Sequence, residues 1–98
     1  MAENYIDYEV VEASAQSYSQ QAEALGAVLQ TLAGTNDALQ GGFKNQTATA
    51  FIERYDSEYK VALEKAQEAL LSISEFLTTY MNNRMEEDNA TAGSVTGG

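Results

Sequence analysis

The chain has 98 residues, of which 44% are hydrophobic, and this is enough for one folded domain and too apolar for a disordered chain. Its formal net charge of −10 disfavours binding to nucleic acid or to anionic membranes, because like charges repel. Cysteine and histidine are absent, which removes disulfides, thiolate metal sites and the commonest general base. We therefore expect no enzyme, no metal and no cofactor.

The N-terminal residues 1–6 are predicted to form a flexible lead. They contain no basic segment followed by an apolar one, so they do not have the pattern of a secretory signal peptide. No later stretch approaches the roughly 18 apolar residues that a membrane span needs, so we expect no membrane insertion. If the protein leaves the cytoplasm, a dedicated machine is expected to export it.

A first helix is predicted over about residues 7–39, with Asp7 as its N-cap. Apolar side chains recur at intervals of seven and four residues and therefore share one face. This face consists of Val11, Ala15, Tyr18, Ala22, Leu25, Leu29, Leu32 and Leu39. Gly26 and Gly34 interrupt the pattern, and we interpret them as positions of close helix approach or as local weak points.

A turn is predicted over about residues 40–45. Gly41 and Gly42 are expected to end the first helix by supplying a left-handed cap, and Asn45 is expected to cap the start of the second helix. Because so short a connection returns the chain beside itself, the two helices are predicted to be antiparallel.

A second helix is predicted over about residues 46–85, and residues 86–98, which are acidic and then rich in glycine, are predicted to be a disordered tail. The apolar positions of this helix advance in alternating steps of three and four residues. They are Phe51, Ile52, Tyr55, Tyr59, Ala62, Leu63, Ala66, Ala69, Leu70, Ile73, Phe76, Leu77 and Tyr80.

Each apolar face spans about 140° of its helix, which is more than one neighbouring helix covers. We therefore predict an all-α fold, an antiparallel two-helix hairpin that pairs with a second hairpin into a four-helix bundle as a dimer. The expected dimer interface consists of Val11, Tyr18, Leu25, Leu29, Leu32, Tyr59, Leu63, Leu70 and Leu77. A monomer whose termini cover the remaining face is the alternative.

The turn region carries a family resemblance. Phe43, Asn45 and Phe51 are similar to the Trp, the Gly and the following aromatic residue of the Trp-x-Gly signature of the WXG family. These proteins, which include the early secreted antigens, are small helical hairpins of the ESX or type VII secretion system of Gram-positive bacteria and mycobacteria. Tyr80 resembles the tyrosine of the family's Tyr-x-x-x-Asp/Glu export signal, but Arg84 stands where that signal has its acid.

The resemblance implies a protein that is secreted without a cleavable signal peptide and is cytoplasmic before export. It implies export as a dimer, or service as the helical partner or chaperone of an exported effector. The implied partners are a second copy, another WXG-like hairpin or an effector, together with the secretion ATPase. Because one partner of such a pair can carry the signal for both, Arg84 in place of the acid implies that this chain is the passenger or the chaperone-like half of a pair. The alternative function is that of a structural hairpin subunit that self-assembles in another secretion apparatus.

Overall fold

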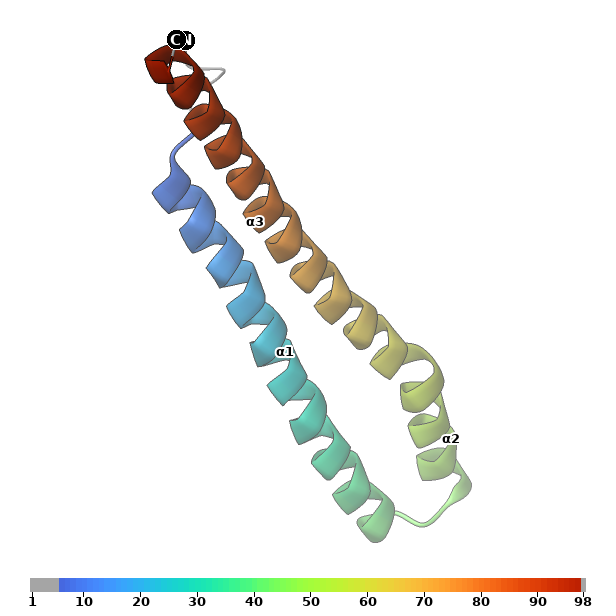
Figure 1. Ribbon diagram of the computed structural model, residues 1–98. Coiled ribbons are helices and arrows are strands. Elements are labelled where there is room, and N and C mark those ends of the chain that lie inside the picture. The colour runs from blue at the N-terminus through green and yellow to red at the C-terminus, as the bar shows by residue number, and fades with distance from the viewer. Residues whose placement is uncertain (1–5, 98) are drawn as a thin grey trace.

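The computed structural model describes residues 6–97, with side chains described as far as residue 88, and forms an elongated antiparallel hairpin (Figure 1). Helix α1 (Tyr8–Gly42) makes one arm. The other arm consists of α2 (Gln46–Arg54), the π-helical turn η2 (Tyr55–Tyr59) and α3 (Lys60–Gly97). Residues 6–97 contain no strand, so the predicted all-α hairpin is confirmed. The expected lead, residues 1–6, lies outside the described residues except for its last position.

Both predicted N-caps are present. The Asp7 carboxylate accepts a hydrogen bond from the backbone N–H of Val10 at 3.2 Å, at the start of α1. The Asn45 side chain accepts one from the backbone N–H of Ala48 at 2.9 Å, at the start of α2. Each cap satisfies a donor that the first turn of a helix leaves without an internal partner. Asn45 therefore determines where the turn ends and α2 begins.

The predicted left-handed glycine cap is wrong. Gly41 and Gly42 both belong to α1, and no glycine in the described part of the chain has a positive φ. Helix α1 ends instead at Phe43, whose backbone is extended and whose N–H donates to the Leu39 carbonyl at 2.8 Å. Because this bond continues the helical pattern to the last residue, the chain leaves α1 without needing a left-handed residue.

Small side chains on α1 allow α3 to approach closely. Ala15 and Ala22 are the most buried residues of α1, at 4% and 1% exposure. The Gln67 amide donates to the Ala22 carbonyl at 3.0 Å, and the Ser74 hydroxyl donates to the Ala15 carbonyl at 2.8 Å. Two polar side chains of α3 thus bind backbone groups of α1 directly. They belong to the inner strip of α3, which we define as the half-buried residues Leu63, Gln67, Leu70, Ser74, Leu77, Met81 and Arg84.

The two interior glycines of α1 have different surroundings. A Cβ atom at Gly26 would lie 2.8 Å from the Gln67 amide nitrogen, so this position is one of close approach. A Cβ atom at Gly34 would meet no atom within 4 Å, so Gly34 is a weak point of the helix without a packing reason. Gly26 is therefore the position of close approach, and Gly34 is the local weak point.

The second arm is not the single helix that was predicted over residues 46–85, because η2 interrupts it. Tyr55, at the start of η2, is buried, and the first residue of the inner strip, Leu63, follows eight residues later. A heptad repeat would return to the same face of the helix after seven residues. In η2 the N–H of Lys60 bonds to the carbonyl of Tyr55, which places one more residue in the turn than an α-helix has. The π turn therefore absorbs the extra residue and keeps both halves of the arm packed on α1.

Helix α3 continues to Gly97, beyond the predicted helix end at residue 85. Near its end, Asp88 accepts a hydrogen bond from the hydroxyl of Tyr8, which ties the first turn of α1 to α3. Side chains beyond residue 88 lie outside the described residues. The expected disorder of residues 86–98 stays a prediction, which limited proteolysis can test.

Candidate interaction surface

A second apolar line on the η2–α3 arm is left open by the hairpin. Its positions advance in alternating steps of three and four residues, so they form one line along the helix beside the inner strip. We call it the outer strip: Tyr59, Ala62, Ala66, Ala69, Ile73, Phe76 and Tyr80. All of its residues are exposed, and Phe76 is 66% exposed. The hairpin thus partly covers the inner strip of this arm and leaves the neighbouring apolar line exposed to solvent.

The aromatic end of the outer strip is ordered by stacking. The rings of Phe76 and Tyr80 lie 6.3 Å apart between centroids, with an angle of 12° between their planes. A shallow hollow of about 350 Å³ adjoins them. It is lined by Ser72, Glu75, Phe76, Thr79, Tyr80 and Asn83. Exposed, mutually supported aromatic rings are typical of protein–protein interfaces.

The opposite end of the outer strip, at Tyr59, lies beside a surface ion pair. The Arg54 guanidinium donates to the Glu58 carboxylate at 2.9 Å and lies 5.6 Å from the centre of the Tyr59 ring. The hydrogen bond to Glu58 raises the pKa of Arg54 above its already high ordinary value, so Arg54 stays charged. The Tyr59 ring, which is 46% exposed on the outer strip, therefore lies beside a surface ion pair.

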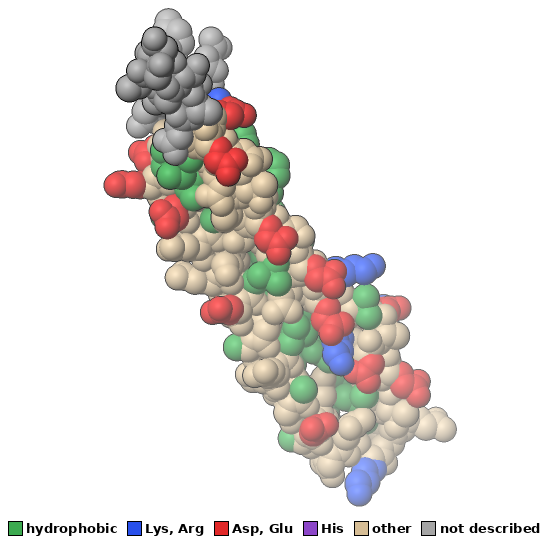
Figure 2. All heavy atoms as spheres, in the orientation of Figure 1, with side chains coloured by type: hydrophobic (Ala, Val, Ile, Leu, Met, Phe, Trp, Pro, Cys, Tyr) green, Lys and Arg blue, Asp and Glu red, His purple; other side chains and the backbone are tan. Residues whose placement is uncertain are grey.

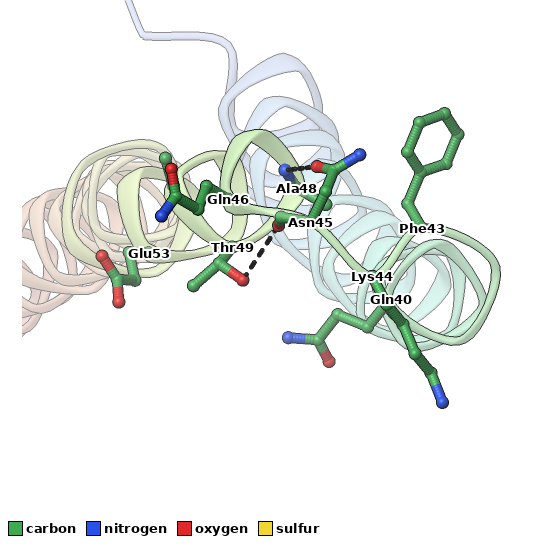
Figure 3. A pocket seen from close by; sticks show the side chains of 9 residues that line it. Gln40, Phe43, Lys44, Asn45, Gln46, Ala48, Thr49 and Glu53 are labelled. Carbon is green, nitrogen blue, oxygen red and sulfur yellow. Dashed lines mark hydrogen bonds between the residues drawn. The ribbon is translucent and has the colours of Figure 1, made fainter.

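The turn forms an open groove of about 590 Å³ between the end of α1 and α2 (Figure 3). It is lined by Gln40, Phe43, Lys44, Asn45, Gln46, Ala48, Thr49, Ala50 and Glu53. The Phe43 ring projects away from the other labelled side chains and is 57% exposed. Phe51 on α2 is also open to solvent, at 43% exposure. Asn45 is used internally as the helix cap, while the two aromatic rings are presented outward.

The described part of the chain holds neither a candidate metal site nor a candidate membrane span. Residues 6–97 contain no group of three or more acidic, histidine or cysteine side chains that could hold a metal ion. Over the same range no helix combines the length and the apolar character required to cross a bilayer. The outer strip and the turn are the surface features of this part of the chain that group exposed aromatic side chains.

One family model, described as "Proteins of 100 residues with WXG", matches residues 5–89. The chain belongs to the WXG100 family. WXG100 proteins are small helical secreted proteins associated with type VII secretion; they are not known as enzymes, and they typically form dimers. Comparisons with curated proteins and with solved structures found no match. The family resemblance expected from the turn is therefore confirmed.

The WXG100 turn of this chain differs from the family signature in its side chains. We expect Phe43 to stand at the tryptophan position, Asn45 at the glycine position, and Phe51 to be the aromatic residue that follows on α2. Asparagine at the second position provides the hydrogen bond that starts α2, which a glycine could not. The correspondence of these three residues with the family motif stays a prediction.

The two residues that are predicted to occupy the export-signal position lie on different strips of α3. Tyr80 is 46% exposed on the outer strip, whereas Arg84 is half-buried on the inner strip. The Arg84 guanidinium donates to the Glu87 carboxylate at 3.2 Å. The structure therefore exposes Tyr80 and directs Arg84 into an intramolecular ion pair, and the correspondence of the two residues with an export signal stays a prediction.

The expected dimer interface divides between the two strips and α1. Tyr18 and Tyr59 are exposed, at 37% and 46%. The remaining expected residues are half-buried in the hairpin: Val11, Leu25, Leu29, Leu32, Leu63, Leu70 and Leu77. Their contact with a partner stays a prediction. The sequence predicts that every outer-strip residue lies on the apolar face of the second helix. Which residues of that face are covered and which are exposed depends on where α1 packs against it.

Proposed function

We propose that this WXG100 protein works in type VII secretion as a dimer-forming hairpin, exported with its partner or serving as the helical partner of an exported effector. The observation that supports this is the outer strip. It places exposed aromatic and aliphatic side chains in one line on a chain whose net charge is −10. A continuous apolar line on an otherwise polar surface is typical of an interaction site, because burial gains about 25 cal/mol per Å² of apolar area.

Pairing through the outer strip would complete a four-helix bundle. The inner strip already packs α3 on α1, so a second hairpin seated on the outer strip gives α3 two helical neighbours. This arrangement uses the full width of the apolar arc. Half-buried residues of the inner strip such as Leu63, Leu70 and Leu77, which adjoin the outer strip, would then be covered from both sides.

The export signal is proposed to be shared between the partners. Tyr80 is available at the surface, but Arg84 replaces the acid and is paired with Glu87. A partner with the complete signal would then be engaged by the secretion ATPase and carry this chain with it. The protein would be cytoplasmic before export and would leave without a cleavable signal peptide.

Disrupting the outer strip tests the proposal. Phe76→Arg places a charge at the most exposed position of the strip, and Thr78→Arg places the same charge on an exposed position outside it. We expect Phe76→Arg to abolish partner binding in sedimentation velocity and to abolish export into the medium, while Thr78→Arg leaves both unchanged. Loss of the type VII ATPase should also abolish export.

The proposal fails if the Phe76→Arg variant is monomeric and still exported at the wild-type level, or if export does not depend on the ATPase. Open-ended filaments in the same sedimentation experiment would instead support the structural-subunit alternative. One apolar line on one side of the hairpin closes with a single partner, whereas a filament needs two different contact surfaces.

A further inference from the structure

Helix α3 carries a third line of residues on the side away from the outer strip. It consists of Glu64, Glu68, Leu71 and Glu75, and each of these follows an inner-strip residue by one position. From Ala62 onward, each outer-strip residue instead precedes an inner-strip residue by one position. Because successive residues of an α-helix are rotated by about 100°, the two lines lie on opposite sides of α3.

Helix α1 carries a matching line on the same side of the hairpin. Its residues recur every seven positions, and each follows a residue that is buried or half-buried against the other arm: Glu9, Gln16, Glu23, Gln30 and Asp37. In an antiparallel pair of helices, the positions that follow the contact line on both helices lie on one side of the pair. We call these two lines the acidic face, and Figure 2 shows acidic side chains along both arms on one face of the molecule.

The acids of this face are not neutralised within the hairpin. All residues of the acidic face are exposed, and within residues 6–88 its acids form no ion pair. The ion pairs of this range, Arg54–Glu58 and Arg84–Glu87, lie outside the face. Lys60, one turn before Glu64, marks the end of the acidic line at the turn side.

The spacing of the acids suits an extended partner and not a single ion. Seven residues of helix separate neighbouring positions of the α1 line by about 10 Å. Carboxylates that share a metal ion each lie about 2.0–2.6 Å from it, and residues 6–97 hold no group of three or more side chains arranged in this way. A helix with a basic residue in every heptad repeats its charges at the matching interval.

An exposed leucine lies in the middle of the acidic face. Leu71 is 42% exposed, and Glu68 and Glu75 flank it one turn away on either side. An aliphatic side chain flanked by carboxylates is complementary to an aliphatic side chain flanked by lysine or arginine, whose stems also pack on apolar surface.

The register of the two arms brings α1 to the same centre. Hydrogen bonds from α3 to the carbonyls of Ala15 and Ala22 fix this register, so Leu71 lies level with the part of α1 between Gln16 and Glu23. The leucine is therefore bordered by acidic or amide side chains of both arms.

We propose that the acidic face docks a basic amphipathic helix of a different protein, with an aliphatic side chain against Leu71 and lysine or arginine residues at heptad spacing beside it. A second copy of this chain does not suit this surface, because the net charge of −10 on each copy is repulsive. The acidic face and the outer strip lie on opposite sides of α3, so the basic helix binds without displacing a partner from the outer strip.

A synthetic helix tests the acidic face. The probe is a peptide about three heptads long, with leucine and lysine repeated on one side, and its control is a scrambled peptide of the same composition. Fluorescence anisotropy with the whole chain should show that the probe binds at least about tenfold more tightly than the scrambled peptide. Its binding should weaken as the salt concentration rises.

Matched variants locate the binding. Glu68→Lys and Glu86→Lys change the net charge equally, but Glu86 lies off the face, two positions after the inner-strip residue Arg84. Glu68→Lys should weaken probe binding by about tenfold or more and Glu86→Lys by less than about threefold, because only the first places a repulsive charge beside the probe. Leu71→Gln should weaken binding by about five- to tenfold, whereas Val61→Gln, at a similarly exposed position off the face, should not. All four positions are exposed, so circular dichroism should show unchanged helix content.

Equal effects of Glu68→Lys and Glu86→Lys would overturn the proposal, because the attraction would then belong to the acidic chain as a whole. Equal binding of the scrambled peptide, or no binding of the probe, would overturn it as well. If Phe76→Arg abolished probe binding while Glu68→Lys preserved it, the probe would occupy the outer strip and not the acidic face. Each of these results leaves the proposed function intact, since that function is tested by partner binding at the outer strip and by export.

Discussion

The two interior glycines of α1 provide a direct test of how the two arms pack. In a helix interior alanine is more favourable than glycine by about 1 kcal/mol. A Cβ atom at Gly34 meets no atom within 4 Å, so Gly34→Ala should gain this amount in full. For a domain of this size, 1 kcal/mol corresponds to a rise in Tm of about 4–8 °C.

Gly26→Ala should not give the same gain. The new Cβ atom would lie 2.8 Å from the Gln67 amide nitrogen, so the amide must move and lose its hydrogen bond to the Ala22 carbonyl. Such a bond contributes about 1 kcal/mol net, which offsets the gain in helix propensity. We therefore expect the free energy of unfolding of Gly26→Ala to stay within about 0.5 kcal/mol of the wild type.

Urea and thermal unfolding followed by circular dichroism would measure both changes. All variants must be compared at one protein concentration, because association shifts the apparent stability. In a Gln67→Ala background the obstruction is gone, and Gly26→Ala should then gain about 1 kcal/mol. The reasoning is refuted if Gly26→Ala stabilises the wild-type chain as much as Gly34→Ala does, or if its effect is the same in both backgrounds.

Three further predictions concern the cap, the π turn and the link between the helix ends. Asn45→Ala should lower the free energy of unfolding by about 1 kcal/mol, whereas Asn45→Asp should keep most of it; equal losses in urea unfolding would contradict the capping role. Deleting Ser57 should leave helix content and Tm near wild type, because it removes the extra residue of η2, whereas deleting Glu68 should lower Tm sharply by rotating all later residues about 100°. The hydrogen bond to Asp88 raises the pKa of Tyr8 above its ordinary value near 10, so the folded chain holds that proton more tightly than the unfolded chain does. The resulting stability is complete below pH 10 and is lost as the pH rises through the folded pKa, so the difference from Tyr8→Phe in urea unfolding should shrink above about pH 10, and a constant difference would contradict it.

Local signals in the sequence predicted most of the hairpin. Asp7 and Asn45 are side chains that cap helices through contacts three residues away, and both do so here. The interruption at η2 was missed, although the sequence holds a trace of it in the eight residues between Tyr55 and Leu63. That spacing becomes informative only when it is known that both residues face the same neighbour.

The candidate interface was predicted less completely, because apolar residues alone do not reveal which helix covers them. Gln67 and Ser74 lie on the line that packs against α1, although they are polar, since each binds a backbone carbonyl there. Ile73 and Phe76 lie on the open line, although they are apolar. Neither assignment follows from hydrophobicity, because both depend on the rotation of α3 about its own axis.

Gln67 and Ser74 bind the carbonyls of Ala22 and Ala15, and both pairs are seven residues apart. A sliding movement of one arm along the other by a few residues would break both hydrogen bonds at once and bring larger side chains into the places of the alanines. Long helices packed only through leucines have many alignments of similar energy, whereas polar contacts at a seam select one. The two bonds therefore fix the axial position of each α3 side chain relative to α1. The positions at which these side chains can contact a neighbouring molecule are thus set before any association takes place.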